Sequence, residues 1–508
     1  MKKIIILPFI LFTLSFLPAD THIPYGDVSG TWSIDGSPYI IDGHINVPVD
    51  SILVIEPGVN VIFSDQYYFR IYGKLLSEGT LIDTIYFTVQ DTINDFAGLF
   101  FCEADTSFQD SSKMNFCKFD PGCVSFNNSS CAIVKNSIVT NGYGIGFDNS
   151  NPTIVDVTIT NNTSEGYGGG LYCTNSSNPS LINVTISGNT AAGAGGIWCN
   201  DNSNPTLDNV YVENNSPNGF SCTSSSPILN NVTISGHEGG GFSCSSSSNP
   251  ILNNVIISNN NSYGGIFCAN SNPILSDVTI NENSADIYGG GIYFLGNCNP
   301  ILINVTITGN EAGGLGGGIC SDFADIIIVN SLIVGNTAGG GGGIGCFYEG
   351  SSMNLTNVTI SENISLNGFG GGIYSEFGSN IHLENCIMWN DIPNEVVILT
   401  GSFVSANYCD IEGGAMGTGN IDDDPLFSDD EFHLSEYSPC IDAGNPDSLY
   451  YDIEDSFNPG YALYPAMGTI LNDMGAYGGH GYYGPPVSVD EELITEKPVI
   501  ELNNYPNP

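Results

Sequence analysis

The middle of the chain repeats one short pattern of apolar and polar residues. From Asn151 it reads NPTIVDVTITNN, from Asn178 it reads NPSLINVTISGN, and the phrase returns every 22 to 28 residues. Each phrase holds short runs of β-branched or aliphatic residues, then glycines and a further run such as GGGLYC. Runs this short are typical of strands and cannot form helices.

Within the runs, apolar residues alternate with polar ones, so Val184 and Ile186 are expected to point inward and Thr185 outward. By the same alternation, Leu171 and Cys173 are expected to point inward. One repeat cannot bury its apolar face alone, so successive repeats must stack as coils. The pattern predicts an all-β parallel β-helix of repeats of about 22–28 residues. A leucine-rich-repeat horseshoe has a similar period, but its ordered leucine pattern is missing.

Two columns of asparagines recur at fixed repeat positions and are predicted to form hydrogen-bonded ladders that support the turns. One column precedes the VTI strand and includes Asn183, Asn209, Asn231, Asn254, Asn304, Asn330 and Asn357, with Asp156 and Asp277 substituting. The second follows that strand and includes Asn162, Asn189, Asn215, Asn260, Asn283, Asn310, Asn336 and Asn363. Glycan attachment at the many N-x-T triplets is the alternative interpretation.

Cysteines also share one repeat position, at Cys173, Cys199, Cys222, Cys244, Cys268 and Cys346, with Cys320 displaced by one. We interpret them first as inward thiols that fill space like small apolar side chains. Disulfides between neighbouring coils are the alternative, since coil spacing lies within the reach of a disulfide.

Aromatic residues expected to point outward form a candidate ligand-binding stripe: Tyr172, Trp198, Phe267, Tyr293 and Tyr374. Rings exposed along a solenoid can stack on sugar rings. Packing of the rings on one another across strands is the simpler alternative.

Residues 30–88 resemble the opening of many secreted bacterial right-handed β-helix proteins, the pectin-lyase-like superfamily, and the repeats are similar to its generic β-helix region. From Asp424 the sequence DPLF, then SPCIDAG, then NDMGAY is similar to a terminal module of surface proteins, which is expected to cap the open end of the helix. The end NYPNP resembles the start of a type IX secretion sorting domain, which implies the type IX machinery as a partner.

The expected organisation has five parts. Lys2 and Lys3, the apolar run from Ile4 to Leu17 and the small residue Ala19 after it predict a signal peptide over 1–19. N-terminal coils follow over 20–112, regular β-helix repeats over 113–400 and a capping module over 401–483. A linker and truncated sorting domain fill 484–508, and no transmembrane segment is expected.

The charge balance excludes several function classes. The chain has 54 acidic residues against 8 Lys and Arg, a formal charge of −46, which argues against binding nucleic acid or anionic membranes. No Lys or Arg lies between Asn136 and Glu496. The resemblance implies lyases and esterases acting on acidic polysaccharides, but these enzymes rely on such cations.

Acidic residues leave two further chemical possibilities. Hydrolysis of neutral glycans requires two carboxylates, and the candidates are Asp201, Glu213, Glu238 and Glu282, with no marked pair. Asp422, Asp423 and Asp424 form a candidate calcium site, with a solvated acidic turn as the alternative. No other cofactor is expected.

The sequence therefore predicts a secreted, non-catalytic β-helix protein with an adhesive or structural role, associated with the cell surface or outer membrane of a Gram-negative bacterium. Its expected partners are extracellular glycans or surface components. The alternatives are a glycan-binding module and a glycoside hydrolase acting on neutral polysaccharide.

Overall fold

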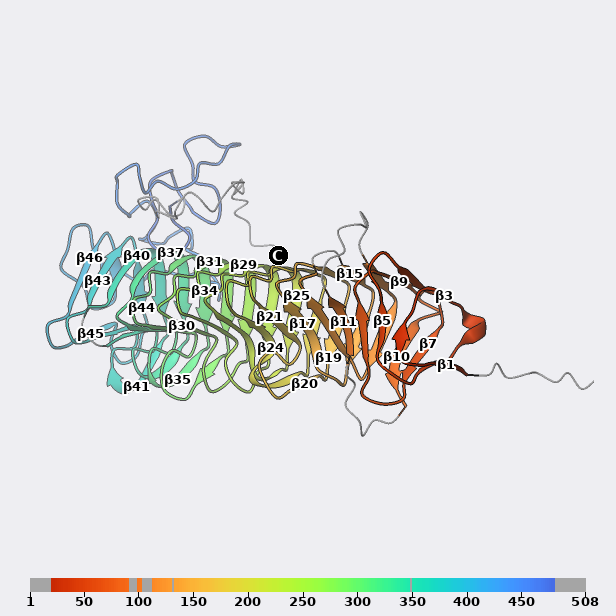
Figure 1. Cartoon of the computed structure of the whole chain (residues 1–508). Helices are drawn as coiled ribbons and strands as arrows, with labels where there is room; N and C mark the ends of the chain where they lie inside the picture. Colours follow the sequence, from red (N-terminus) through yellow and green to blue (C-terminus); the bar gives the residue numbers. More distant parts are fainter. Residues whose placement is uncertain (1–19, 91–97, 103–111, 130–131, 348–349, 480–508) are drawn as a thin grey trace, which may run out of the picture.

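The computed structural model describes residues 20–90, 98–102, 112–129, 132–347 and 350–479. Within these residues the chain is one elongated solenoid of strands (Figure 1), with a 3-10 turn at Ile34–Gly36 and no α-helix. The described part contains no helix long and apolar enough to cross a bilayer. The predicted signal peptide and the sorting-domain start lie outside the described residues.

Two long parallel sheets run the length of the solenoid. Sheet A holds 26 strands, and its central members are β25 (Thr206–Glu213), β27 (Ile228–Ser235), β29 (Ile251–Ser258), β31 (Ile274–Asn281), β34 (Ile301–Thr308), β37 (Asp325–Val334) and β40 (Ser352–Ser361). Sheet B faces it with β21 (Leu171–Thr174), β24 (Thr190–Cys199), β26 (Ser216–Thr223), β28 (Phe242–Ser245), β30 (Ile266–Ala269), β33 (Ile292–Leu295), β36 (Ile319–Asp322), β39 (Ile344–Cys346) and β42 (Ile373–Ser375). Equivalent residues of successive coils pair in parallel, which confirms the predicted fold class.

Each central strand of sheet A bends at an asparagine, or at Asp277 in β31. In earlier coils its two arms are separate strands, β22 (Ser180–Ile182) and β23 (Thr185–Ser187), and both pair with the single strand β25. Asn209, inside β25, has φ of 55°. This left-handed conformation is one that asparagine adopts more readily than most side chains, and it turns the chain around the core.

A short third sheet covers one edge of the later coils. Sheet C consists of β32 (Ser284–Ala285), β35 (Glu311–Leu315), β38 (Thr337–Gly340) and β41 (Ile364–Phe369), paired in that order. Along the chain, each of these strands lies between the sheet A strand and the sheet B strand of the same coil.

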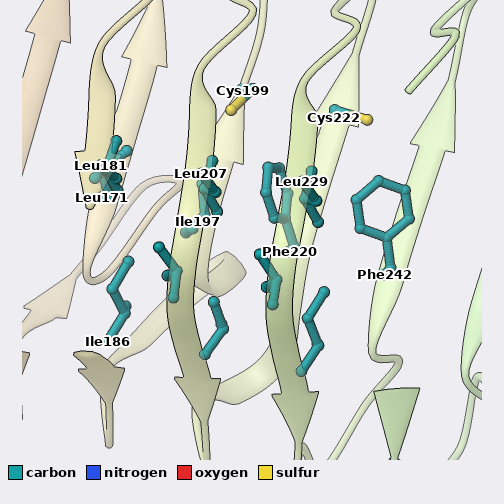
Figure 2. Close-up of a cluster of buried hydrophobic side chains, with 14 of the residues drawn as sticks. Leu171, Leu181, Ile186, Ile197, Cys199, Leu207, Phe220, Cys222, Leu229 and Phe242 are labelled. Atoms are coloured by element: carbon teal, nitrogen blue, oxygen red, sulfur yellow. The ribbon is translucent and has the colours of Figure 1, made fainter. Parts of the chain in front are cut away.

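The core is a stack of similar layers, shown for a few coils in Figure 2. Sheet A contributes Leu181, Leu207 and Leu229, and all three are fully or almost fully buried. Sheet B contributes Phe220 and Phe242 from the facing side. Val184, Ile186, Leu171 and Cys173 are buried while Thr185 and Tyr172 are not, as the alternation predicted. Burial of each large aliphatic or aromatic side chain contributes about 1.5–3 kcal/mol.

The N-terminal region is continuous with the repeats. Strands β4 (Tyr39–Ile41), β7 (Asn60–Phe63), β10 (Ile85–Val89) and β13 (Cys117–Asp120) pair in succession within sheet A. Phenylalanines take the inward positions here, and Phe87 stacks on Phe119 with ring centroids 4.7 Å apart. The first coils therefore pair with one another along sheet A as the later coils do, and their core holds bulkier side chains.

At the other end the solenoid continues past the boundary predicted at residue 400. Strand β46 (Phe403–Asn407) pairs with β43 (Asn380–Glu384), and β47 (Asp410–Ile411) pairs with β44 (Ile387–Trp389). The last coil therefore ends at Ile411, and the C-terminal module, as used below, covers residues 412–479.

The first part of the C-terminal module lies against the last coil, where the backbone amide of Tyr408 donates to the carbonyl of Thr418 and that of Cys409 donates to Asn420 Oδ1 at 3.0 Å. The rest of the module lies along the side of the last coils, above β37 and β40 in Figure 1. Asn330 Nδ2 donates to the carbonyl of Ala476 at 3.2 Å, and Asn357 Nδ2 donates to that of Asp473 at 2.9 Å. Asn385 accepts a further hydrogen bond from the module. The bend asparagines hold it because their side chains point outward from the solenoid.

Candidate functional site

The five predicted stripe aromatics lie on the outer face of sheet B. Tyr172 pairs with Trp198 on the next coil, and Phe267 pairs with Tyr293. Tyr374 occupies the same position further along, paired with Gly345. The five aromatic residues therefore share one column, as the sequence predicted, and the coils between them have small residues at this position.

Rings from the neighbouring turns cover much of this column. Tyr167 stacks on Trp198 with centroids 4.2 Å apart and planes 25° apart. Tyr288 lies 5.6 Å from Tyr293. Tyr374 is only 6% exposed, so the expectation of an exposed ring is wrong at this position. The aromatic rings of the column therefore pack mainly on other rings, and they do not form one continuous exposed face.

One part of the column remains open to solvent. Tyr167 is 55% exposed, and Trp198 beneath it is half-buried. The indole Nε1 of Trp198 is buried and has no hydrogen-bond partner. This ring pair is the best-formed candidate for contact with a flat apolar ligand such as the face of a sugar ring.

The four candidate carboxylates lie in different turns. Asp201 follows β24 and accepts a hydrogen bond from Thr174, and Glu213 ends β25. Glu238 accepts from Ser216 at 2.8 Å, in the turn after β27. Glu282 follows β31. The arrangement marks no two of them as an acid and its partner.

Asp422, Asp423 and Asp424 are exposed and are used by the turn around them. Asp422 accepts from the amide of Gly413 and Asp424 from that of Leu426. In the described residues, the one cluster of three or more potential metal ligands is Asp429, Glu431 and His433. The predicted calcium triad is therefore not assembled, and Asp422 and Asp424 accept different backbone amides.

The Asp429 cluster is also explained by local turn structure. Its Oδ1 accepts the backbone amides of Glu431 and His433, and its Oδ2 lies 2.9 Å from His433 Nδ1. The His433 ring packs between Tyr464 and Tyr477. All these contacts order the module from within.

The module motif similarly has a structural use. Asp473, from NDMGAY, accepts the backbone amides of Asp442 and Met467 at 2.8 and 2.7 Å. Burial, together with the charges of neighbouring acids, raises the pKa of both Asp473 and Asp452. Cys440 is buried and packs with Ile387 of the solenoid. Asp473 therefore orders the module from within, and Cys440 packs the module against the solenoid.

The cysteines that share the repeat position, Cys173, Cys199, Cys222, Cys244, Cys268 and Cys346, and the displaced Cys320 are free thiols. Cys173, Cys199, Cys222, Cys244 and Cys268 follow one another in register on five coils, and all are buried. Cys320 lies one position away, opposite Tyr293, as predicted. Burial raises the pKa of Cys199, Cys222, Cys244, Cys268 and Cys320, which disfavours the reactive thiolate.

The predicted asparagine ladder at the bend is present but exposed over most of its length. Asn209 Nδ2 donates to Asn183 Oδ1 at 2.7 Å, and Asn254 Nδ2 donates to Asn231 Oδ1 at the same distance. Asn231 itself donates to Asp208 and not to Asn209. Asn304 donates to Asp277.

The second asparagine column is the buried ladder. Asn260 donates to Asn283, Asn283 to Asn310 and Asn310 to Asn336, each with both its backbone amide and its Nδ2. The Nδ2 atom also reaches a carbonyl of the preceding coil, as in Asn283 to Ile257. Each side chain thus links three coils.

A buried serine ladder escaped the sequence interpretation. The backbone amide of one serine donates to the hydroxyl of the next along Ser150, Ser177, Ser203, Ser225, Ser248 and Ser271. Cys298 takes the next position. The signal was available, because most of these residues precede a repeated Asn-Pro pair.

Comparisons with known proteins bear on the fold. A solved periplasmic alginate epimerase is similar with a TM-score of 0.38 and 13% identity over 71% of this chain and 76% of that one. A solved pectate lyase gives a TM-score of 0.23 and 14% identity over 85% and 89% of the two chains. These likenesses are too weak to bear on activity.

No curated protein matches the chain. The family model described as "right handed beta helix region" matches residues 101–256 and 223–388, which together span more than half of the 508 residues. The described residues of this range form the parallel coils given above. The chain belongs to this right-handed β-helix family.

Proposed function

We propose that this protein is a non-catalytic β-helix with an adhesive or structural role, secreted through the type IX machinery and held at the surface of a Gram-negative cell. The observation that carries the proposal is the absence of Lys and Arg from Asn136 to Glu496. A surface this acidic repels polyuronates and lacks the cations that their cleavage requires.

The use made of the recurring polar side chains supports the same proposal. The asparagine and serine columns are bonded along the solenoid axis. The four candidate carboxylates lie in separate turns, and two of them accept hydrogen bonds from neighbouring hydroxyls. The surface that a partner can contact is that of a long solenoid with exposed turns, and such a surface supports a binding or structural role better than a catalytic one.

A purified chain incubated with a panel of neutral and acidic polysaccharides is expected to release no new reducing ends or unsaturated sugars. Release of either product, abolished by replacing one acid such as Glu238→Gln, would overturn the non-catalytic assignment. Protease added to intact producing cells is expected to cleave the protein, and complete protection would contradict surface display.

Glycan binding is a second candidate, favoured by the open Tyr167–Trp198 ring pair. Affinity electrophoresis in neutral polysaccharide is expected to show retardation that Tyr167→Ala removes and Trp198→Ala weakens, because Tyr167 offers the open ring face and Trp198 supports it from beneath. Tyr211→Ala is the matched control, because Tyr211 is exposed on sheet A. Equal mobility of the chain with and without every polysaccharide would eliminate this candidate.

A further inference from the structure

The buried asparagine ladder ends in an aspartate. Asn363 donates its backbone amide and its Nδ2 to Asp391 Oδ1, at 2.7 and 2.9 Å. Asp391 thus stands where the next asparagine is expected, and it is only 5% exposed. An asparagine would offer a donor at its second atom, whereas a carboxylate offers another acceptor.

A second buried carboxylate lies against this ladder end. Glu395, which is 7% exposed, accepts the backbone amide of Asp391 through Oε1 at 3.0 Å. The remaining oxygens, Asp391 Oδ2 and Glu395 Oε2, are buried and have no hydrogen-bond donor. Two buried acceptors side by side without a donor are costly unless something positive lies between them.

Both side chains line a cavity of about 520 Å³ at the C-terminal end of the solenoid, where the core opens beside the last coil. Its other walls include Leu383, Ile411 and Glu412. Glu412 contributes a third carboxylate, close enough to affect the ionisation of Glu395. None of the described residues that line the cavity is a Lys or an Arg.

We propose that Asp391 and Glu395 bind one hard divalent cation, calcium in the first place, in the cavity at the C-terminal end of the β-helix. Calcium takes six to eight oxygen ligands, and carboxylates are among those it prefers. Asp391 Oδ2 and Glu395 Oε2 are the direct ligands. Glu412 adds negative charge, and the cavity has room for water to complete the coordination.

The cation also has a structural consequence. It joins the end of the ladder to the segment around Glu395, which forms one wall of the cavity. The competing arrangement is a proton shared between the two acids. Burial and the neighbouring carboxylates raise the pKa of both Asp391 and Glu395, so a shared proton is the form expected when calcium is removed.

The test is thermal unfolding and calorimetric titration of the chain, first in chelator and then in calcium chloride. The wild-type chain is expected to bind one calcium ion and to melt at a higher temperature in calcium, because only the folded state holds the site. Asp391→Asn and Glu395→Gln should each weaken binding by at least about 100-fold, more than the loss of an outer-shell partner costs.

Asp391→Asn separates a cation site from a merely structural acid. Its new amide can donate to Glu395, so in chelator it should melt at or above the wild-type temperature while losing the shift with calcium. Asp424→Asn, a change of equal charge in the exposed turn, should keep the shift. The proposal is overturned if calcium leaves the wild-type melting temperature unchanged, or if Asp424→Asn removes the shift and Asp391→Asn keeps it.

Discussion

The two asparagine columns look alike in sequence but differ in what they do. In the buried column, Asn283 takes part in four side-chain hydrogen bonds with two neighbouring asparagines and a carbonyl. In the bend column, Asn209 donates one, to Asn183, from an exposed position. The buried column supplies hydrogen-bond partners to buried polar groups, whereas the bend column supplies residues that adopt the positive φ of the bend.

The substitutions that the chain itself carries fit this difference. The bend column accepts aspartate at Asp156 and Asp277, which share the left-handed φ of the asparagines. The buried column has His237 in place of one asparagine and Asp391 at its end. A bend needs a residue type that tolerates positive φ, while the buried ladder needs a donor and an acceptor at each step.

The largest effect is expected from Asn283→Ala. The change leaves the amide of Asn260 and the carbonyl of Ile257 without their partner, and each buried unsatisfied group costs about 1–3 kcal/mol. We expect a loss of about 3 kcal/mol or more, measured by urea unfolding followed by circular dichroism. A loss below about 1 kcal/mol would show that water replaces the missing amide and that the column is not a dry ladder.

His237 tests the same column through pH. Its Nδ1 lies 3.0 Å from the amide of Asn215, its Nε2 lies 3.1 Å from the carbonyl of Val212, and it is fully buried. Burial lowers its pKa below the ordinary value. As pH falls below about 6.5, the unfolded chain takes up the proton first, so the folded state loses stability.

We therefore expect His237→Asn to be more stable relative to the wild-type chain at pH 5 than at pH 7.5. The measurement is the difference in unfolding free energy between the two chains at each pH. His382→Asn is the control, because His382 is partly exposed and lies outside the ladder. An identical pH dependence for wild type and His237→Asn would mean that the imidazole is protonated in the folded state as well.

The sequence alone was sufficient for the coils, because the apolar alternation repeats with every strand. The inward positions of Val184 and Cys173 and the shared register of the thiols followed from period and spacing. The sequence could not show which of the two asparagine columns is buried, because the burial of an asparagine side chain depends on the side of the bend on which it lies. That in turn is set by the φ of residues such as Asn209.

The candidate site was harder to predict for a related reason. The stripe aromatics share a column, but the rings that cover them, Tyr167 and Tyr288, come from turns whose paths the repeat does not fix. The Asp391–Glu395 pair depends on where the ladder ends. Periodic sequence predicts the periodic part of a solenoid, and its irregular turns and ends require the structure.

The smallest effect, and the sharpest test of the comparison, comes from replacing Asn209 with alanine and with glycine. Alanine at φ of 55° is expected to cost about 1–2 kcal/mol, whereas glycine adopts this angle freely and should cost less, so Asn209→Gly should be the more stable variant. At Asn283 the order should reverse, because glycine restores no hydrogen bond and adds unfolded-state entropy. Urea midpoints of the four variants give both orders. If the alanine and glycine variants ranked in the same order of stability at both sites, the two columns would have the same structural role.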